Sequence, residues 1–277
     1  DRLSNDRLVL VLFKGMDSVG RDSEGSVSVD KEFLTTFARG LEVIRSFDTD
    51  TPSMSLSAVA EKNNLSRAAA RRFLLTLQKL GYVTQDDKKF RLTAKVLELG
   101  YSFLASLDFS ETITPFMEEV SYQLGESCSA LVLDGVDIVY VARIPRRGLI
   151  PINLQIGARL PAYATSGGRV LLASLPAQEL DQVIRDTRFE KLTAYTKGPD
   201  ELRAELEKIR MNGYAVVDQE LELGMRALAV PVFDRRGRAR FALNSSSHVS
   251  TVSIDRIIDE YVPIMQSASR KITEVLP

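Results

Sequence analysis

The stretch from Ser55 to Leu92 reads SLSAVAEKNNLSRAAARRFLLTLQKLGYVTQDDKKFRL. Its pattern predicts a short helix capped by Ser55 or Ser57, a tight turn, a second helix and a two-stranded hairpin. Ser66 stands where the second helix should be capped, and Gly81 stands where that helix should end. Apolar residues recur along the second helix at helical spacing and predict one buried face, formed by Ala70, Phe73, Leu74, Leu77 and Leu80.

The opposite face of the second helix is basic. No acidic residue occurs between Leu65 and Leu80, and small residues near the helix start permit close approach to another surface. Arginines and small residues on one helix face fit a DNA major groove, and basic residues of the hairpin fit phosphates. We therefore predict DNA contacts from Ser66, Arg67, Ala68, Arg71, Arg72, Lys88 and Arg91. A helical hairpin with a solvated charged face is the alternative, but it does not account for the basic hairpin that follows.

The composition is that of a folded protein with more than one domain. The chain has 277 residues, 44% of them hydrophobic, and a formal net charge of -1. Residues 31–100 carry 12 lysines and arginines against 8 acidic residues, so a basic head on an acidic body is expected. A single cysteine, Cys128, excludes an internal disulfide and suits a cytoplasmic protein. One cysteine and one histidine argue against a zinc site, and no apolar run reaches membrane-spanning length.

The order of the elements predicts an α+β protein. We expect a mobile leader over residues 1–30, the DNA-binding domain over 31–92, a linker helix over 93–109 and a second domain over 110–277. An amphipathic helix over 33–47 should complete the core of the DNA-binding domain. The linker helix is apolar over much of its circumference, so either the second domain or a second copy of the linker should cover it. In the second domain, strands are predicted at 130–133, 138–142, 150–156, 214–217, 227–233 and 240–243, and helices at 113–124, 169–175, 177–186, 200–212 and 254–275.

The second domain should hold a small ligand. Its best candidate is the stretch Ala164–Arg169, where Thr165, Ser166, Gly167 and Gly168 precede a helix whose first amides could bind a carboxylate. Two polar stretches could face the same concavity, Val217–Glu220 with Asp218 and Asn244–His248 with Asn244 and Ser246. A tight turn into a helix, and serines that satisfy their own backbone, are the alternatives.

Catalysis is the lesser hypothesis. Ser246, His248 and Asp218 contain the residue types of a nucleophilic triad, but Ser246 does not lie on a G-x-S-x-G turn. Redox chemistry at Cys128 would lack a second cysteine. We therefore expect no catalytic residue, no metal and no cofactor.

Several ordered stretches resemble the IclR family of bacterial transcriptional regulators. They are SLSAVAEKNNLSRAAARRFLLTLQKLGYV, FRLTAKVLELGYSFL, VYVARIP, IGARLPAYATSGGRVLLASLP and IRMNGYAVVDQELELGMRALAVPVFDRRGRARFALN. The resemblance implies a winged helix-turn-helix, a linker helix used in dimerisation and a GAF-like effector domain with an antiparallel sheet flanked by helices. It also implies homodimers or tetramers on palindromic double-stranded operator DNA.

A finer resemblance is to the branch that regulates catabolism of protocatechuate, 4-hydroxybenzoate and β-ketoadipate. It is carried by PAYATSGGRVLLA, VVDQELELGMRALAVPV and ALNSSSH. By position it implies an effector pocket at Ser166, Gly167, Asp218, Ala227, Asn244 and Ser246, for an aromatic acid or a dicarboxylate. Family members often have a polar or thiol residue at Ala227, and usually Ser or Thr at Ala68 and Ala69, which shifts the weight of DNA recognition to Arg67, Arg71 and Arg72.

The expected function is therefore ligand-responsive regulation of genes for aromatic-compound catabolism. Two alternatives remain open at this point. One is a regulator of the same family for another small-acid pathway, and the other is an enzyme with a vestigial winged domain.

Overall fold

A computed structural model describes residues 33–48, 50–106, 110–146 and 154–276, which form two compact units divided between residues 107 and 108. Each unit is described by itself. The leader predicted for residues 1–30 lies outside the described residues. No helix within these ranges is both long and apolar enough to span a membrane.

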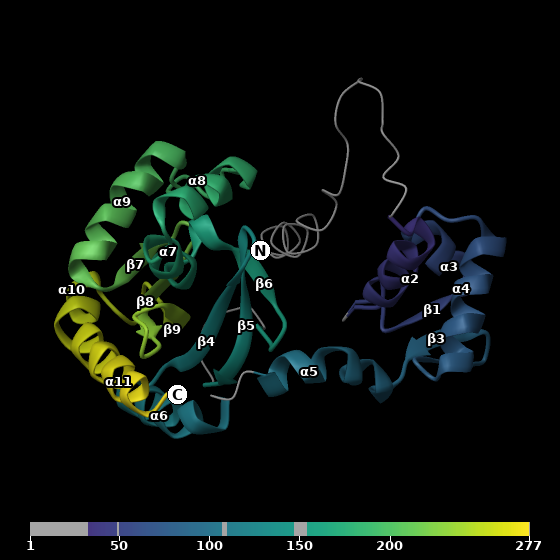
Figure 1. The fold of residues 1–277 in the computed structure, drawn as a ribbon, viewed down its shortest axis with the longest axis horizontal. Coiled ribbons are helices and arrows are strands. Elements are labelled where there is room, and N and C mark those ends of the chain that lie inside the picture. Colours follow the sequence, from purple (N-terminus) through teal and green to yellow (C-terminus); the bar gives the residue numbers. More distant parts are fainter. Residues whose placement is uncertain (1–32, 49, 107–109, 147–153, 277) are drawn as a thin grey trace. The chain divides into compact units, whose positions relative to one another are not determined.

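The first unit contains the predicted helix, turn, helix and hairpin (Figure 1). Its core joins Val43 of the first helix, Val59 of the second, and Ala70 and Leu74 of the third, all of which are fully buried. The elements are α2 (Thr35–Arg45), β1 (Ser53–Ser55), α3 (Leu56–Lys62), α4 (Arg67–Leu80), β2 (Val83–Asp86), β3 (Lys89–Leu92), the 3-10 helix η1 (Ala94–Leu97) and α5 (Glu98–Ser106).

Local capping residues set the ends of these helices. Ser55, rather than Ser57, caps α3, because its Oγ accepts a hydrogen bond from the amide of Ala58 at 3.2 Å. Ser66 caps α4 in the same way, and Gly81 ends it in the left-handed conformation at φ 84°. Leu80 was expected on the buried face but is 52% exposed. Because each residue turns the helix by about 100°, Leu80 lies roughly 80° around the axis from Ala70, beyond the edge of the buried stripe.

The wing has a two-residue turn and three strands, one strand more than predicted. Asp86 pairs with Lys89, so only Asp87 and Lys88 form the turn, both with positive φ as in a type I′ hairpin. A third strand, β1, pairs with β3 and places Met54 opposite Phe90. No strand was predicted here, because three residues carry too little alternation to be recognised.

The second unit is built on one antiparallel sheet of six strands in the order β6-β5-β4-β9-β8-β7. Its strands are β4 (Ser127–Asp134), β5 (Asp137–Ile144), β6 (Arg159–Pro161), β7 (Ala215–Asp218), β8 (Met225–Phe233) and β9 (Ala239–His248). Its helices are α6 (Ser110–Leu124), η2 (Ala162–Ala164), α7 (Ser166–Ala173), α8 (Ala177–Asp186), α9 (Pro199–Asn212), α10 (Ile254–Arg256), the π-helical turn η3 (Ile257–Tyr261) and α11 (Val262–Val275).

Helices cover both faces of this sheet. The central strands β4 and β9 are buried along nearly their whole length, which requires a layer on each side. Helix α7 lies on the face that carries Leu131 and Ala242, and it packs against α9. Helices α6 and α11 pack together and against β4 and β8 (Figure 1). The result is the predicted antiparallel sheet flanked by helices.

Three predicted elements of this unit need correction. Of the strand predicted at 150–156, residues 150–153 lie outside the described residues, and Leu154–Ile156 is not a strand; the strand is β6 at Arg159–Pro161. Helix α7 begins at Ser166 and not at Arg169, because Thr165 caps it. Strand β9 continues through Asn244 to His248, since both of its neighbours supply hydrogen bonds that the polar sequence gave no reason to expect.

Candidate DNA-binding face and effector cavity

The exposed side of α4 is cationic. Arg67, Ala68, Arg71 and Arg72 are all exposed, and none of the three arginines forms an ion pair with a described residue. Ser66 is also exposed, but its hydroxyl oxygen is engaged in capping the helix. Unpaired guanidinium groups on a helix with a buried opposite side are the arrangement that a major groove or a phosphate requires.

One residue of this face was not predicted. Leu75 is 41% exposed and follows Ala68 and Arg72 at helical spacing, on the side opposite Ala70 and Leu74. An apolar side chain at this place can contact the methyl group of thymine. The sequence did contain the signal, since Leu75 interrupts an otherwise polar stripe.

The wing presents its cations on one side. In β3, Lys89 and Arg91 are exposed while Phe90 between them is buried, because successive strand residues point to opposite faces. Lys88 lies at the tip of the turn. These side chains are placed to contact phosphates beside a helix in the groove.

The second unit contains a cavity where the first turn of α7 meets the sheet. Apolar side chains from β4, β5, β6 and the loop before β8 form most of its wall, and polar side chains from α7 and β9 form one end. Its lining comprises Leu131, Ile138, Tyr140, Leu154, Leu160, Ala164, Thr165, Ser166, Val217, Leu221, Met225, Arg226, Ala227, Asn244 and Ser246. The free volume inside is about 30 Å³, far less than an aromatic acid needs.

Five of the predicted effector residues line this cavity, namely Thr165, Ser166, Ala227, Asn244 and Ser246. Gly167 and Gly168 do not. A Cβ on Gly167 would lie 2.2 Å from Cδ1 of Leu131, and a Cβ on Gly168 would lie 2.2 Å from the carbonyl oxygen of Ala162. The two glycines therefore let α7 pack directly against Leu131 and Ala162 of the same unit.

Asp218 also lies outside the lining. Its carboxylate accepts hydrogen bonds from Nε of Arg226 at 2.7 Å and from Nη2 at 3.3 Å. The third nitrogen of Arg226 donates to the carbonyl of Val252. Asp218 thus neutralises Arg226, and the register places both side chains on the face of the sheet opposite Ala227 and Ser246.

At the polar end of the cavity, the side-chain amide of Asn244 bonds to three neighbouring groups. Nδ2 of Asn244 donates to Oγ of Ser166 at 2.9 Å and to the carbonyl oxygen of Leu228 at 3.1 Å. Oγ of Ser246 donates to Oδ1 of Asn244 at 3.4 Å. Ser166 accepts here, so its own proton remains available to a ligand. Together with the positive end of the α7 dipole, this free hydroxyl proton makes the end suitable for an acid.

Arg169, the last residue of the predicted stretch Ala164–Arg169, binds Glu220 and is not free to bind a ligand. It is 1% exposed and forms a two-point ion pair with Glu220, at 2.8 Å and 2.5 Å. Its Nε donates to the carbonyl of Tyr163. The backbone amide of Lys197 also donates to Glu220. This buried pair joins α7 to the loop between β7 and β8.

The residues considered for a catalytic triad do not form one. His248 Nδ1 lies 2.7 Å from Oγ of Ser250, Asp218 is paired with Arg226, and Ser246 is bonded to Asn244. Within the described residues there is also no group of three or more metal-ligating side chains of the His, Cys, Asp and Glu types.

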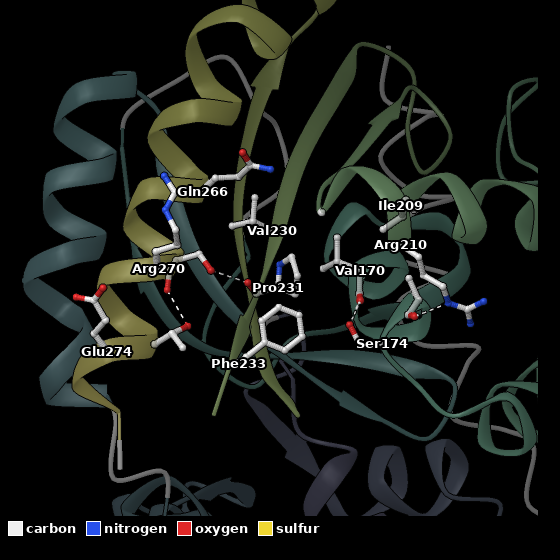
Figure 2. Close-up of a pocket in the computed structure, with 14 residues that line it drawn as sticks. Val170, Ser174, Ile209, Arg210, Val230, Pro231, Phe233, Gln266, Arg270 and Glu274 are labelled. Carbon is white, nitrogen blue, oxygen red and sulfur yellow. Dashed lines mark hydrogen bonds between the residues drawn. The ribbon is translucent and has the colours of Figure 1, made fainter. Parts of the chain in front are cut away.

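A larger cleft of about 670 Å³ lies elsewhere in the same unit (Figure 2). Figure 2 shows it between α11 on one side and α7 and α9 on the other, with β8 as its floor. Strand β7 has ended here, so the edge of β8 would be open to another strand. Pro231 has no amide proton to donate, and its carbonyl oxygen already accepts a hydrogen bond from Oγ of Ser269 at 2.6 Å. Neither backbone group of Pro231 is therefore free to pair with another strand. None of the predicted effector residues lines this cleft.

Two family models match the chain, each mainly in one unit. The model of the IclR helix-turn-helix domain matches residues 36–87, and the model of the IclR C-terminal domain of bacterial transcriptional regulators matches residues 101–274. The Pca regulon regulatory protein of Pseudomonas putida is 38% identical over 249 residues, covering 89% of this chain and 86% of that protein. The p-hydroxybenzoate hydroxylase transcriptional activator of Acinetobacter baylyi is 32% identical, covering 89% and 93%.

Two solved structures are also similar. A structure from Rhodococcus sp. RHA1, assigned to the transcriptional regulators, is 44% identical with a TM-score of 0.77, covering 87% of this chain and 98% of that one. A double mutant of the PobR inducer-binding domain from Acinetobacter, in complex with 3-hydroxybenzoic acid, is 30% identical with a TM-score of 0.56, covering 59% and 97%. The matching families and relatives are regulators of transcription and not enzymes. The chain belongs to the IclR family of bacterial transcriptional regulators.

Proposed function

We propose that this regulator controls genes of aromatic-compound catabolism and that its effector is a small aromatic acid held in the cavity at the start of α7. The observation that carries the proposal is the composition of the cavity. Its polar end at Ser166 and Asn244, beside the first amides of α7, suits one carboxylate, and the apolar remainder suits a ring. The names of the Pseudomonas and Acinetobacter relatives, and the hydroxybenzoate bound by the PobR domain, support the same class of compound.

The size of the cavity suggests how the ligand acts. With about 30 Å³ of free space, the described arrangement is too narrow for the ligand, so binding must favour an arrangement in which the walls are farther apart. Helix α7 carries one wall and is tied by Arg169 and Glu220 to the loop between β7 and β8. A ligand that separates α7 from β9 would therefore move this loop as well.

We further propose that the protein binds palindromic duplex DNA as a homodimer, or as a tetramer built from such dimers. The DNA contacts are those predicted above, with Arg67, Arg71 and Arg72 of α4 in the major groove and Lys88 and Arg91 of the wing on phosphates. Apolar side chains supply a surface for a second copy. Leu34 and Phe37 at the start of α2, and Leu97 and Tyr101 of the linker, are each more than two-thirds exposed.

A thermal-shift screen of the full chain tests the effector. A ligand that binds only the folded state must raise the melting temperature. We expect 4-hydroxybenzoate, protocatechuate or 3-hydroxybenzoate to do so in a concentration-dependent way, and Ser246→Phe, which fills the cavity, to abolish the shift. A shift with β-ketoadipate alone would replace the aromatic acid by a dicarboxylate, and an undiminished shift in Ser246→Phe would place the ligand elsewhere.

Selection from a random pool of duplex DNA tests the second proposal. A dimer of winged domains should enrich an inverted repeat. Enrichment of a single half-site would contradict the homodimer, and enrichment of nothing above the unselected pool would contradict sequence-specific binding.

A further inference from the structure

The buried tyrosines of the second unit differ in one respect. Tyr140, Tyr163 and Tyr261 are each 3% exposed. The hydroxyl of Tyr163 donates to the carbonyl of Glu190 at 2.9 Å and accepts from its amide at 3.0 Å, and the hydroxyl of Tyr261 donates to the carbonyl of Leu124 at 3.2 Å. No hydrogen bond to a described residue engages the hydroxyl of Tyr140. Nearly all buried polar groups in folded proteins are bonded to protein or to water. The fully enclosed side-chain atoms without a partner among the described residues are Oε2 of Glu222 and Oγ of Ser245, and the Tyr140 oxygen is not one of them.

Of these three tyrosines, Tyr140 lines the effector cavity, so its hydroxyl is available to a ligand there. Leu131 of β4 pairs with Tyr140 on one side and with Ala242 on the other, so these three side chains share a face of the sheet. Asn244 follows Ala242 by two residues and shares this face too. Tyr140 and Asn244 therefore border the same space from strands that are separated by β4, about 10 Å apart.

The surroundings of the two ends differ in charge. Asn244 stands with Ser166 and the start of α7, where an anion is favoured. Tyr140 stands among apolar side chains such as Ile138 and Leu160. Burial raises the pKa of Tyr140 above its ordinary value, so its phenol stays protonated and can both donate and accept. This end suits an uncharged polar group and not a second carboxylate.

We infer that Tyr140 determines effector specificity by hydrogen bonding to a ring hydroxyl para to the carboxylate, which the Asn244 end binds. This inference deepens the proposed function and depends on it. It selects hydroxylated monocarboxylic acids over benzoate, which leaves the Tyr140 hydroxyl unpaired, and over dicarboxylates, which would bury a second charge there.

Calorimetric titration of the full chain with 4-hydroxybenzoate and with benzoate tests the inference. The wild-type protein should bind 4-hydroxybenzoate at least tenfold more tightly. Tyr140→Phe removes only the hydroxyl, and it should weaken binding of 4-hydroxybenzoate about tenfold while leaving that of benzoate within twofold. Its melting temperature without ligand should be unchanged or higher, because no hydrogen bond to a described residue is lost. Tyr163→Phe is the matched control: it should lower the melting temperature and keep the wild-type preference.

The outcomes separate the inference from the proposed function. If the wild-type protein binds both acids equally, or if Tyr140→Phe keeps the wild-type preference, Tyr140 does not bind the ring hydroxyl and the inference is wrong. The proposal of an aromatic acid as effector is unaffected by either result. If the wild-type protein binds neither acid nor any other hydroxybenzoate, the proposed effector class is wrong and the role of Tyr140 falls with it.

Discussion

The side-chain amide of Asn244 donates a hydrogen bond to the hydroxyl of Ser166 at 2.9 Å, and so joins strand β9 to the first turn of α7. Both residues are buried, at 4% and 0% exposure, and they are 78 residues apart in the sequence. The bond crosses the polar end of the cavity, where an acid is proposed to enter. Effector binding and the position of α7 are therefore linked through this pair.

Asn244→Ala should destabilise the protein and weaken its response to ligand. The substitution leaves the carbonyl of Leu228 and the hydroxyl of Ser166 without their partner, at a cost of about 1–3 kcal/mol. Denaturant unfolding measures the loss, and the control is Ser250→Ala, which removes only an exposed hydrogen bond to His248 in the turn after β9. An unchanged midpoint in Asn244→Ala would show that the bond contributes nothing to stability.

Arg72→Ala should weaken operator binding without affecting the effector. Arg72 is exposed on α4 and free of ion pairs with described residues, so its charge is available to DNA. If it contacts a phosphate, the slope of log affinity against log salt should fall by about 1. If it contacts a base, the loss should instead depend on operator sequence, by about 1–3 kcal/mol. Lys271→Ala, exposed on α11, should retain wild-type operator affinity and salt dependence.

Breaking the buried ion pair should be far more costly than breaking an exposed one. Arg169→Met removes the two-point partner of Glu220, which is 4% exposed, and leaves that buried charge only the ammonium group of Lys197 at 3.8 Å and the Lys197 amide, at a cost of up to about 3–5 kcal/mol. Arg256→Met breaks the exposed i,i+4 pair with Glu260 and should lower the unfolding free energy far less. Equal losses in the two variants, measured by chemical denaturation, would contradict the structural role given to Arg169.

Gly168→Ala should be severely destabilising. Its Cβ would lie 2.2 Å from the carbonyl oxygen and 2.4 Å from Cα of Ala162, and backbone atoms cannot move aside as a flexible side chain would. Gly100→Ala is the matched control, since a Cβ there meets nothing within 4 Å and alanine favours a helix. We expect Gly100→Ala to be neutral or stabilising, and a Gly168→Ala protein of wild-type stability would refute the close packing of α7 on η2.

Glu222→Gln should remove part of the pH dependence of stability. Burial raises the pKa of the Glu222 carboxyl, and its Oε2 has no hydrogen-bond partner. A carboxyl whose pKa is higher in the folded state contributes stability below its unfolded pKa and loses it as pH rises through the folded pKa. In chemical denaturation, Glu222→Gln should therefore gain stability relative to the wild type as the pH rises above 4.5, the ordinary pKa of this carboxyl. Glu118→Gln, at an exposed position of α6, should keep the wild-type curve.

The DNA-binding unit could be predicted almost entirely from its sequence. Ser66 and Gly81 bound α4 by contacts within a few residues, and the spacing of Ala70, Leu74 and Leu77 is fixed by the helix itself. The failures were Leu80, at the edge of the stripe, and β1, which exists only because β3 pairs with it. The exposure of Leu80 and the presence of β1 are set by the elements that pack or pair beside them and not by the local sequence pattern.

The candidate effector site was only partly predictable. The stretches around Ser166, Ala227 and Asn244 were identified from their polar residues and from the family resemblance, and all three residues line the cavity. The glycines were identified for the wrong reason, because close packing against Leu131 and Ala162 explains them without a ligand. Tyr140 and Arg226 were not identified, since nothing in their own strands distinguishes a cavity wall from an ordinary core position.

The sequence by itself therefore determined the helix-turn-helix, its basic face, the family and the general place of the effector domain. These follow from periodicity, capping and motif order, which act within single elements. Only the tertiary structure decided that Asp218 binds Arg226, that Arg169 binds Glu220, and that Tyr140 lines the cavity with a hydroxyl that bonds to no described residue. The physical reason is that these relationships depend on strand order, β5-β4-β9-β8, which brings together residues far apart along the chain and which no local pattern encodes.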